Sequence, residues 1–248
     1  MFKNLNNHFL FLGTILNACG VPITNKIEVI DLISDFHFEF QEYRSSRIGA
    51  VGGIFSNGQT PIICGGYHNE LLPDCFILGS NTLPHKYQNK FSTSIITNEL
   101  LCLIGGQVDG IEQSSMKLLS IKNDLNVDEE KLPFQISHHT IVTIDENKSY
   151  LIIGGQINQE VTKKTWILTI TKKPENSQQL CFSLSKGPNL INGRKSHCSC
   201  KVFLNNRNYV IVTGGCDKYN KVLSSVEILD LSENQLNWRI GNNNSNEL

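Results

Sequence analysis

The stretch "LCLIGGQVDGIEQSSMKLLSI" at residues 101–121 joins an apolar run to two glycines, a polar segment and a second alternating run. The stretch "YLIIGGQINQEVTKKTWILTI" at 150–170 repeats that order in other residues. Glycine is a poor strand former, because it loses more backbone freedom on ordering than other residues and has no side chain to pack. A glycine pair that twice ends an apolar run therefore indicates a backbone requirement that the two segments share.

Glycine pairs also end the runs "PIICGG" (61–66) and "YVIVTGG" (209–215), and an imperfect copy, "TILNACG" (14–20), has Cys19 in place of the first glycine. The second glycines stand at residues 20, 66, 106, 155 and 215, in steps of 46, 40, 49 and 60. Such uneven steps indicate a structural unit with loops of variable length. We predict a structural role for the complete pairs, which are Gly65, Gly66, Gly105, Gly106, Gly154, Gly155, Gly214 and Gly215.

Strand-like runs surround each glycine pair. "HHTIVTI" (138–144) precedes one pair and "KTWILTI" (164–170) follows it, and short fourth runs are "FHFEF" (36–40), "CFSL" (181–184) and "LNWRI" (236–240). Four short strands separated by polar turns are typical of a β-propeller blade. We expect one domain over 1–240, with blades at roughly 9–42, 47–88, 91–122, 138–185 and 196–240, followed by a disordered tail at 241–248.

The fullest copy of the repeat, residues 194–238, contains Arg194, His197, the pair Gly214–Gly215, "SSVEILDL" and Trp238. This pattern resembles the Kelch repeat, and five copies cover about residues 9–240. The other copies lack the tryptophan. The resemblance implies an all-β Kelch-type propeller of about five blades with four antiparallel strands each. The ring is expected to be incomplete, or a partial member of a six-bladed parent.

The cysteines bear on the compartment. Cys64 and Cys75 end the segment "CGGYHNELLPDC", a span that adjacent antiparallel strands can bridge, and the segment also resembles secreted Kelch-type proteins. A disulfide there would indicate an oxidising compartment. The N-terminal "MFKNLNNHFLFLGTILNACG" reads either as a signal peptide or as the first strand. These features leave secretion and a cytoplasmic location equally open.

Composition excludes some functions. The 248 residues are 40% hydrophobic and carry a net charge of −1, so the chain can form a sizeable core but has no field that would attract nucleic acid. No apolar run approaches the ~20 residues of a transmembrane helix.

Candidate chemistry in the sequence is weak. In "HCSC" (197–200), strand alternation places Cys198 and Cys200 on one face and His197 on the other, so the three do not converge on a metal. His138 and His139 diverge in the same way. The segment "GPNLINGRKS" (187–196) lacks the spacing and the helix of a phosphate-binding loop and is predicted to be a turn. We therefore predict no catalytic, metal or cofactor-binding residues.

The resemblance implies protein binding, in the cytosol as a receptor of a ubiquitin ligase or on actin. The longest insertion lies between the last two glycine pairs, and long loops commonly carry function. We therefore predict partner contacts at Lys172, Lys173, Lys186 and Arg194. The alternatives are a Kelch-like enzyme of the galactose-oxidase or sialic-acid-isomerising type, and a secreted propeller that binds carbohydrate or matrix.

Overall fold

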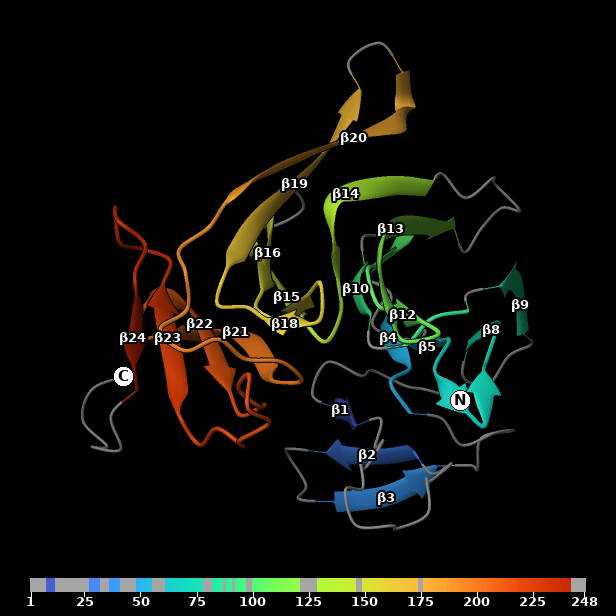
Figure 1. The fold of residues 1–248 in the computed structure, drawn as a ribbon, viewed down its shortest axis with the longest axis horizontal. Helices are drawn as coiled ribbons and strands as arrows, with labels where there is room; N and C mark the ends of the chain where they lie inside the picture. Colours follow the sequence, from blue (N-terminus) through green and yellow to red (C-terminus); the bar gives the residue numbers. More distant parts are fainter. Residues whose placement is uncertain are drawn as a thin grey trace. The chain divides into compact units, whose positions relative to one another are not determined.

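The chain folds into antiparallel β-sheets, and the part that the structure describes contains no helix (Figure 1). The computed structural model describes residues 8–11, 27–31, 36–40, 48–54, 61–77, 82–86, 88–90, 92–96, 100–120, 129–145, 149–173 and 176–241. The imperfect glycine segment at 14–20, and residues 242–248 of the expected tail, lie outside these ranges. The chain divides into two compact units, Met1–Pro133 and Phe134–Leu248.

Three main sheets belong to the first unit, and strand β14 continues into the second. The first sheet has the order β1 (His8–Phe11), β2 (Ile27–Asp31), β3 (Phe36–Phe40). The second has the order β4 (Val51–Ile54), β5 (Pro61–Cys64), β8 (Asp74–Ile77), β9 (Thr82–Lys86), beside a hairpin of β6 (Tyr67–His68) and β7 (Glu70–Leu71). The third joins β10 (Thr93–Ile96), β11 (Leu100–Ile104), β12 (Gln107–Val108), β13 (Ile111–Ser120) and β14 (Glu129–Ile136).

Two four-stranded sheets form the second unit. The fourth sheet has the order β15 (Thr140–Asp145), β16 (Ser149–Ile153), β19 (Thr165–Lys173), β20 (Asn176–Lys186), and β17 (Gln156–Ile157) pairs with β18 (Glu160–Val161). The fifth has the order β21 (Cys198–Leu204), β22 (Arg207–Thr213), β23 (Val226–Asp230), β24 (Trp238–Ile240). Each sheet is thus a simple meander, as in a propeller blade.

The second strand of the third and of the fourth sheet is buried on both faces, which explains why its sequence reads as an unbroken apolar run. In β11, the residues from Leu101 to Ile104 are at most 1% exposed, and in β16 the residues from Tyr150 to Ile153 are at most 3% exposed. These strands end directly at the glycine pairs. The apolar run and the glycines together therefore mark the centre of a sheet and its end.

The fourth and fifth sheets pack face to face around one core. Its members come from both sheets and from the segment that connects them, and they are Val142, Leu151, Ile153, Leu190, Val210, Val212, Leu229 and Trp238. The first strands of the two sheets, β15 and β21, lie in contact, and in the first unit β4 and β10 do the same. Contact between the first strands of successive sheets is the arrangement expected around a propeller axis.

The five main sheets lie close to the residue ranges predicted for the blades, with two differences. The first sheet has three strands among the described residues, where four were expected. The prediction ended the third blade at residue 122, whereas the structure adds β14 as a strand paired with β13. Pro133 lies within β14, and an outer strand accommodates proline because its free edge needs no hydrogen bond. Within the described part of the chain, no helix has the length and apolarity required to span a membrane.

Candidate functional site

The predicted glycine pairs lie where four strands end and the backbone turns. All eight glycines have positive φ, from 55° at Gly154 to 103° at Gly106. At Gly155, with φ of 91°, an added Cβ would lie 2.6 Å from the Ser137 carbonyl oxygen and 2.7 Å from the His139 Cβ. Both the backbone conformation and the close approach of a neighbouring segment therefore require glycine there.

The residue after each glycine pair forms an antiparallel bridge with the segment that precedes a first strand. The four bridges are Ile48–Tyr67, Lys90–Gln107, Ser137–Gln156 and Lys195–Cys216. The residues that follow Ser137 and Lys195 have a left-handed backbone conformation, with φ of 54° at His138 and 53° at Ser196. The bridges tie each glycine end to neighbouring backbone, and a tight turn projects beyond each of them.

The last of these turns, Cys216–Leu223, is here called the C-terminal turn, and its backbone is held from within by Asp217. Oδ1 of Asp217 accepts hydrogen bonds from the backbone N–H groups of Tyr219 at 2.8 Å and Lys221 at 3.0 Å. The Asp217 N–H donates to the Lys221 carbonyl, and the Asp217 carbonyl accepts from the Asn220 N–H. Asn220 has φ of 58°, a conformation that asparagine tolerates better than most residues. The turn is therefore a preorganised structure.

The C-terminal turn exposes two large side chains. Tyr219 is 77% exposed and Val222 is 74% exposed, the highest values among the large apolar residues that the structure describes. The Lys218 ammonium lies 4.9 Å from the centre of the Tyr219 ring, a cation–π contact. An aromatic side chain on a fixed backbone is well suited to contact another molecule, because little conformational freedom remains to be lost.

Arg194 stabilises this turn by hydrogen bonds to the residues on either side of it. Its side chain is fully buried, and Nη1 donates to the carbonyl oxygens of Gly214 at 3.0 Å and Ser225 at 3.1 Å, one on each side of the turn. Nη2 donates to the Ser225 Oγ at 2.9 Å and to the Glu227 Oε1 at 2.7 Å. The prediction that Arg194 contacts a partner from a surface loop is therefore wrong, because its guanidinium is enclosed and neutralised inside the fifth sheet.

The segment around Arg194, Gly187–His197, is a connector fixed to both sheets of the second unit. The Glu227 carboxylate accepts from the backbone N–H groups of Ile191 at 2.7 Å and Asn192 at 3.0 Å. The Pro188 carbonyl accepts from the Thr165 Oγ1 at 2.7 Å and the Trp238 Nε1 at 2.9 Å. Trp238, the tryptophan of the repeat pattern, thus holds the connector by a hydrogen bond. The stretch predicted as a turn is a structural link between two sheets.

The predicted lysines lie on the preceding hairpin. Pairing between β16 and β19 ends at Ser149–Thr169, whereas β19 and β20 stay paired as far as Lys173–Asn176, so they continue as a two-stranded ribbon (Figure 1). Lys172 and Lys173 belong to this ribbon, and their side chains are not among those described. Lys186 ends β20 and is exposed. Lys172 and Lys173 therefore belong to the ribbon, and Lys186 lies where β20 meets the connector that contains Arg194.

His139 and His197 are buried. Burial lowers the pKa of His139 to about 3, helped by the charges of His197 and His138. Burial, and then the Arg194 charge, lowers the pKa of His197 to about 3, and its Nε2 lies 2.9 Å from the Thr140 Oγ1. Cys198 and Cys200 are exposed while His197 is buried, as strand alternation predicts. Within the described residues, no cluster of three or more histidine, cysteine or acidic side chains could hold a metal.

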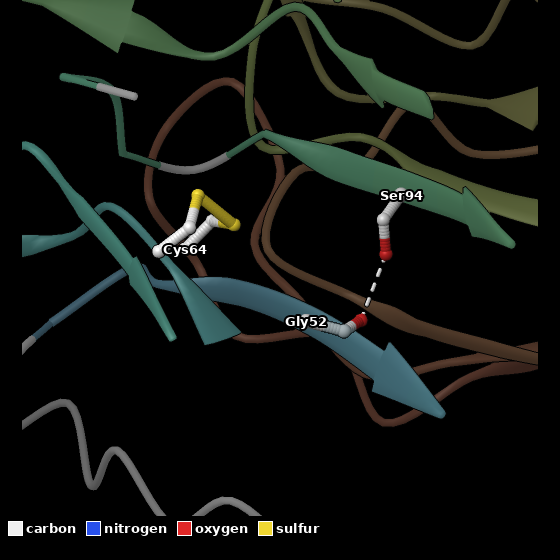
Figure 2. Close-up of a disulfide and its surroundings, with 4 residues drawn as sticks. Gly52, Cys64 and Ser94 are labelled. Carbon is white, nitrogen blue, oxygen red and sulfur yellow. Dashed lines mark hydrogen bonds between the residues drawn. A yellow bond between two sulfur atoms is a disulfide. The ribbon is translucent and has the colours of Figure 1, made fainter. Parts of the chain in front are cut away.

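The predicted disulfide between Cys64 and Cys75 is present (Figure 2). The two residues lie directly opposite each other on β5 and β8, and neither is exposed. Beside it, the Ser94 hydroxyl of β10 donates to the Gly52 carbonyl of β4 at 2.7 Å and joins two sheets of the first unit (Figure 2). The free cysteines among the described residues are Cys102, Cys181, Cys198, Cys200 and Cys216.

Comparison with known proteins supports this reading of the fold. The Kelch motif matches residues 197–236, which include the C-terminal turn. The solved structure of YjhT superposes with a TM-score of 0.60 at 10% sequence identity, over 88% of this chain and 76% of that one. At this identity the likeness is one of fold alone. A search of curated proteins finds no matching sequence.

Proposed function

We propose that this chain, a Kelch-repeat protein with the antiparallel sheets of a β-propeller, is a non-catalytic module that binds another protein through the loops between its strands. The observation that carries the proposal is the C-terminal turn. Tyr219 and Val222 are more than 70% exposed, on a backbone fixed by Asp217. Rigid, exposed aromatic side chains are enriched among residues that dominate binding energy.

The internal support of the turn strengthens this proposal. Burying a charged pair such as Arg194 and Glu227 is costly, and hydrogen bonds to its remaining donors and acceptors reduce that cost. Here the guanidinium holds the carbonyls of Gly214 and Ser225 at the base of the turn. Arg194 and Glu227 thus support the shape of the turn from inside the protein.

The ribbon of β19 and β20 offers a second contact region. Beyond Thr169 it is paired only with itself, and Lys172 and Lys173 lie near its end. We propose that these lysines and Lys186 contribute further contacts to the partner, since exposed hairpins tolerate variation and commonly carry binding residues.

A secreted binder of carbohydrate or matrix is the second candidate. The buried Cys64–Cys75 disulfide favours it, because such bonds persist in oxidising compartments. Mass spectrometry of the native protein under non-reducing conditions tests this candidate, which predicts an intact bond. Finding Cys64 and Cys75 reduced, like the five free cysteines that the structure describes, would contradict it.

The main proposal is tested by measuring how much of a partner protein is captured by the wild type and by two variants, one changed in the C-terminal turn and one changed elsewhere on the surface. Tyr219→Ala combined with Val222→Ala should abolish recovery of a partner protein that the wild type retains. Phe203→Ala, which removes a side chain that is also 67% exposed, should not. Equal recovery by all three proteins would contradict the proposal. So would turnover of galactose by the purified protein loaded with copper, because the chain would then be an enzyme.

A further inference from the structure

The C-terminal turn is basic as well as aromatic. Lys218 and Lys221 are exposed on it, and Lys195 is joined to it through its backbone bridge with Cys216. The ion pairs of the second unit join Arg194, Arg207 and Arg239 to acidic groups, and none of them involves these three lysines among the described residues. Asp217, the acidic residue of the turn, directs Oδ1 to two backbone N–H groups. The exposed Lys218 and Lys221 are therefore available to another molecule, and Lys195 is half-buried at its bridge with Cys216.

The corresponding turns after the other glycine pairs carry acidic side chains instead of basic ones. They contain Glu70, Asp109 and Glu160, and all three residues are exposed. No lysine or arginine lies in Tyr67–Leu71, Gln107–Glu112 or Gln156–Val161. Since the four turns share the same glycine ends and bridges, the fold itself does not require lysines at this position. Among the four described turns, a lysine within the turn itself occurs only in the last one, although Lys90 occupies the bridge position that corresponds to Lys195.

Resting on the proposed function, we infer that the C-terminal turn binds an acidic segment of the partner protein, with Tyr219 at its centre and Lys195, Lys218 and Lys221 around it. Hydrogen bonds between ammonium groups and carboxylates are about twice as strong as those between neutral groups. The Tyr219 hydroxyl can donate a hydrogen bond to a further carboxylate. The ring supplies apolar contact that a purely ionic surface would lack.

A nucleic acid is a poorer fit to the same surface. Binding of a phosphate backbone depends on many cations, and the affinity scales with the number of phosphates neutralised. The chain as a whole has a net charge of −1, so no wide basic field surrounds the three lysines. A short acidic peptide needs only the local charge that the turn provides.

The inference is tested with a fluorescein-labelled random copolymer of glutamate and tyrosine, and binding is followed by fluorescence anisotropy at low and high salt. The wild type should bind the copolymer, and affinity should fall as the salt concentration rises. Tyr219→Ala should weaken binding about tenfold, and Lys218→Glu with Lys221→Glu should abolish it. The side chains of Tyr219, Lys218 and Lys221 are all exposed, so the thermal unfolding temperature should not change.

The control variant is Lys131→Glu with Lys164→Glu, which reverses two charges at exposed positions outside the turn. It should bind the copolymer like the wild type. Binding that survives both turn variants, or that only the control variant loses, would overturn the inference, as would tighter binding of an oligothymidylate. If the native partner still requires Tyr219 while the copolymer does not bind, the acidic-segment inference fails and the proposed function stands.

Discussion

The Nη2 atom of Arg194 lies 2.7 Å from the Oε1 atom of Glu227, and both side chains are fully buried. Removing one member of a buried pair leaves the other charge without compensation. We therefore expect Glu227→Ala to lower the free energy of unfolding by about 3–5 kcal/mol. It also deprives the Ile191 and Asn192 N–H groups of their acceptor. Urea unfolding followed by tryptophan fluorescence measures the change.

Arg239→Ala is the control for this prediction. Its guanidinium is 58% exposed and pairs with Glu233 at 3.3 Å, so removal should cost less than about 1 kcal/mol. A Glu227→Ala loss as small as that of Arg239→Ala would show that the buried pair does not hold the connector and the C-terminal turn together.

Gly155→Ala should destabilise the protein far more than Gly110→Ala. Both residues have positive φ, 91° and 79°, so each alanine meets a backbone penalty of about 1–2 kcal/mol. An added Cβ at Gly155 would also meet the Ser137 carbonyl at 2.6 Å, whereas nothing lies within 4 Å at Gly110. Overpacking adds about 1–3 kcal/mol. Thermal melts of the two variants measure the difference in stability. Equal melting temperatures would show that the close approach of the Ser137 carbonyl to Gly155 does not matter for stability.

The sheets could be predicted from the sequence because their central strands are buried on both faces and end in glycine. Burial makes "LCLI" and "YLII" unbroken apolar runs, and positive φ makes the following glycines necessary. The Cys64–Cys75 bond could be predicted because the two residues flank a short polar segment between two strands.

Arg194 could not be placed correctly from local sequence. It lies in a polar stretch of glycine, asparagine and serine, which is typical of an exposed loop. The carboxylate that permits its burial is Glu227, 33 residues away on strand β23. Strand β14 could not be predicted from local sequence either. It begins with charged residues and contains Pro133, and both features are unusual in a strand. They obscure the alternation in which Leu132 is buried and Pro133 is exposed.

Stability should fall as the pH drops from about 6.5 toward 3. Burial lowers the pKa of His139 and of His197 to about 3 from an ordinary value of 6.5. Between these values the unfolded chain binds more protons than the folded one, so the stabilisation is complete above 6.5 and is lost on acidification. Near these rings lie Arg194, whose charge disfavours protonation of His197, and His138, whose charge acts on His139.

The measurement is urea unfolding at several pH values for the wild type and His139→Gln. The variant should show a shallower loss of unfolding free energy between pH 6.5 and 4.5. A hydrogen bond from Ser232 lowers the pKa of the Asp230 carboxyl, which remains in both proteins and acts equally on each. Parallel pH profiles would therefore show that His139 is not the group responsible.

The described cysteines should react with iodoacetamide in a fixed order under native conditions. Cys198 and Cys200 are exposed on β21 and should be alkylated first. Cys102 should resist, because burial raises the pKa of its thiol to about 12 and alkylation requires an accessible thiolate. Cys64 and Cys75 should be labelled only after reduction, and opening the bond should cost about 3 kcal/mol for a sequence separation of 11. Peptide mass spectrometry follows each site, and labelling of Cys102 as fast as that of Cys198 would contradict a buried third sheet.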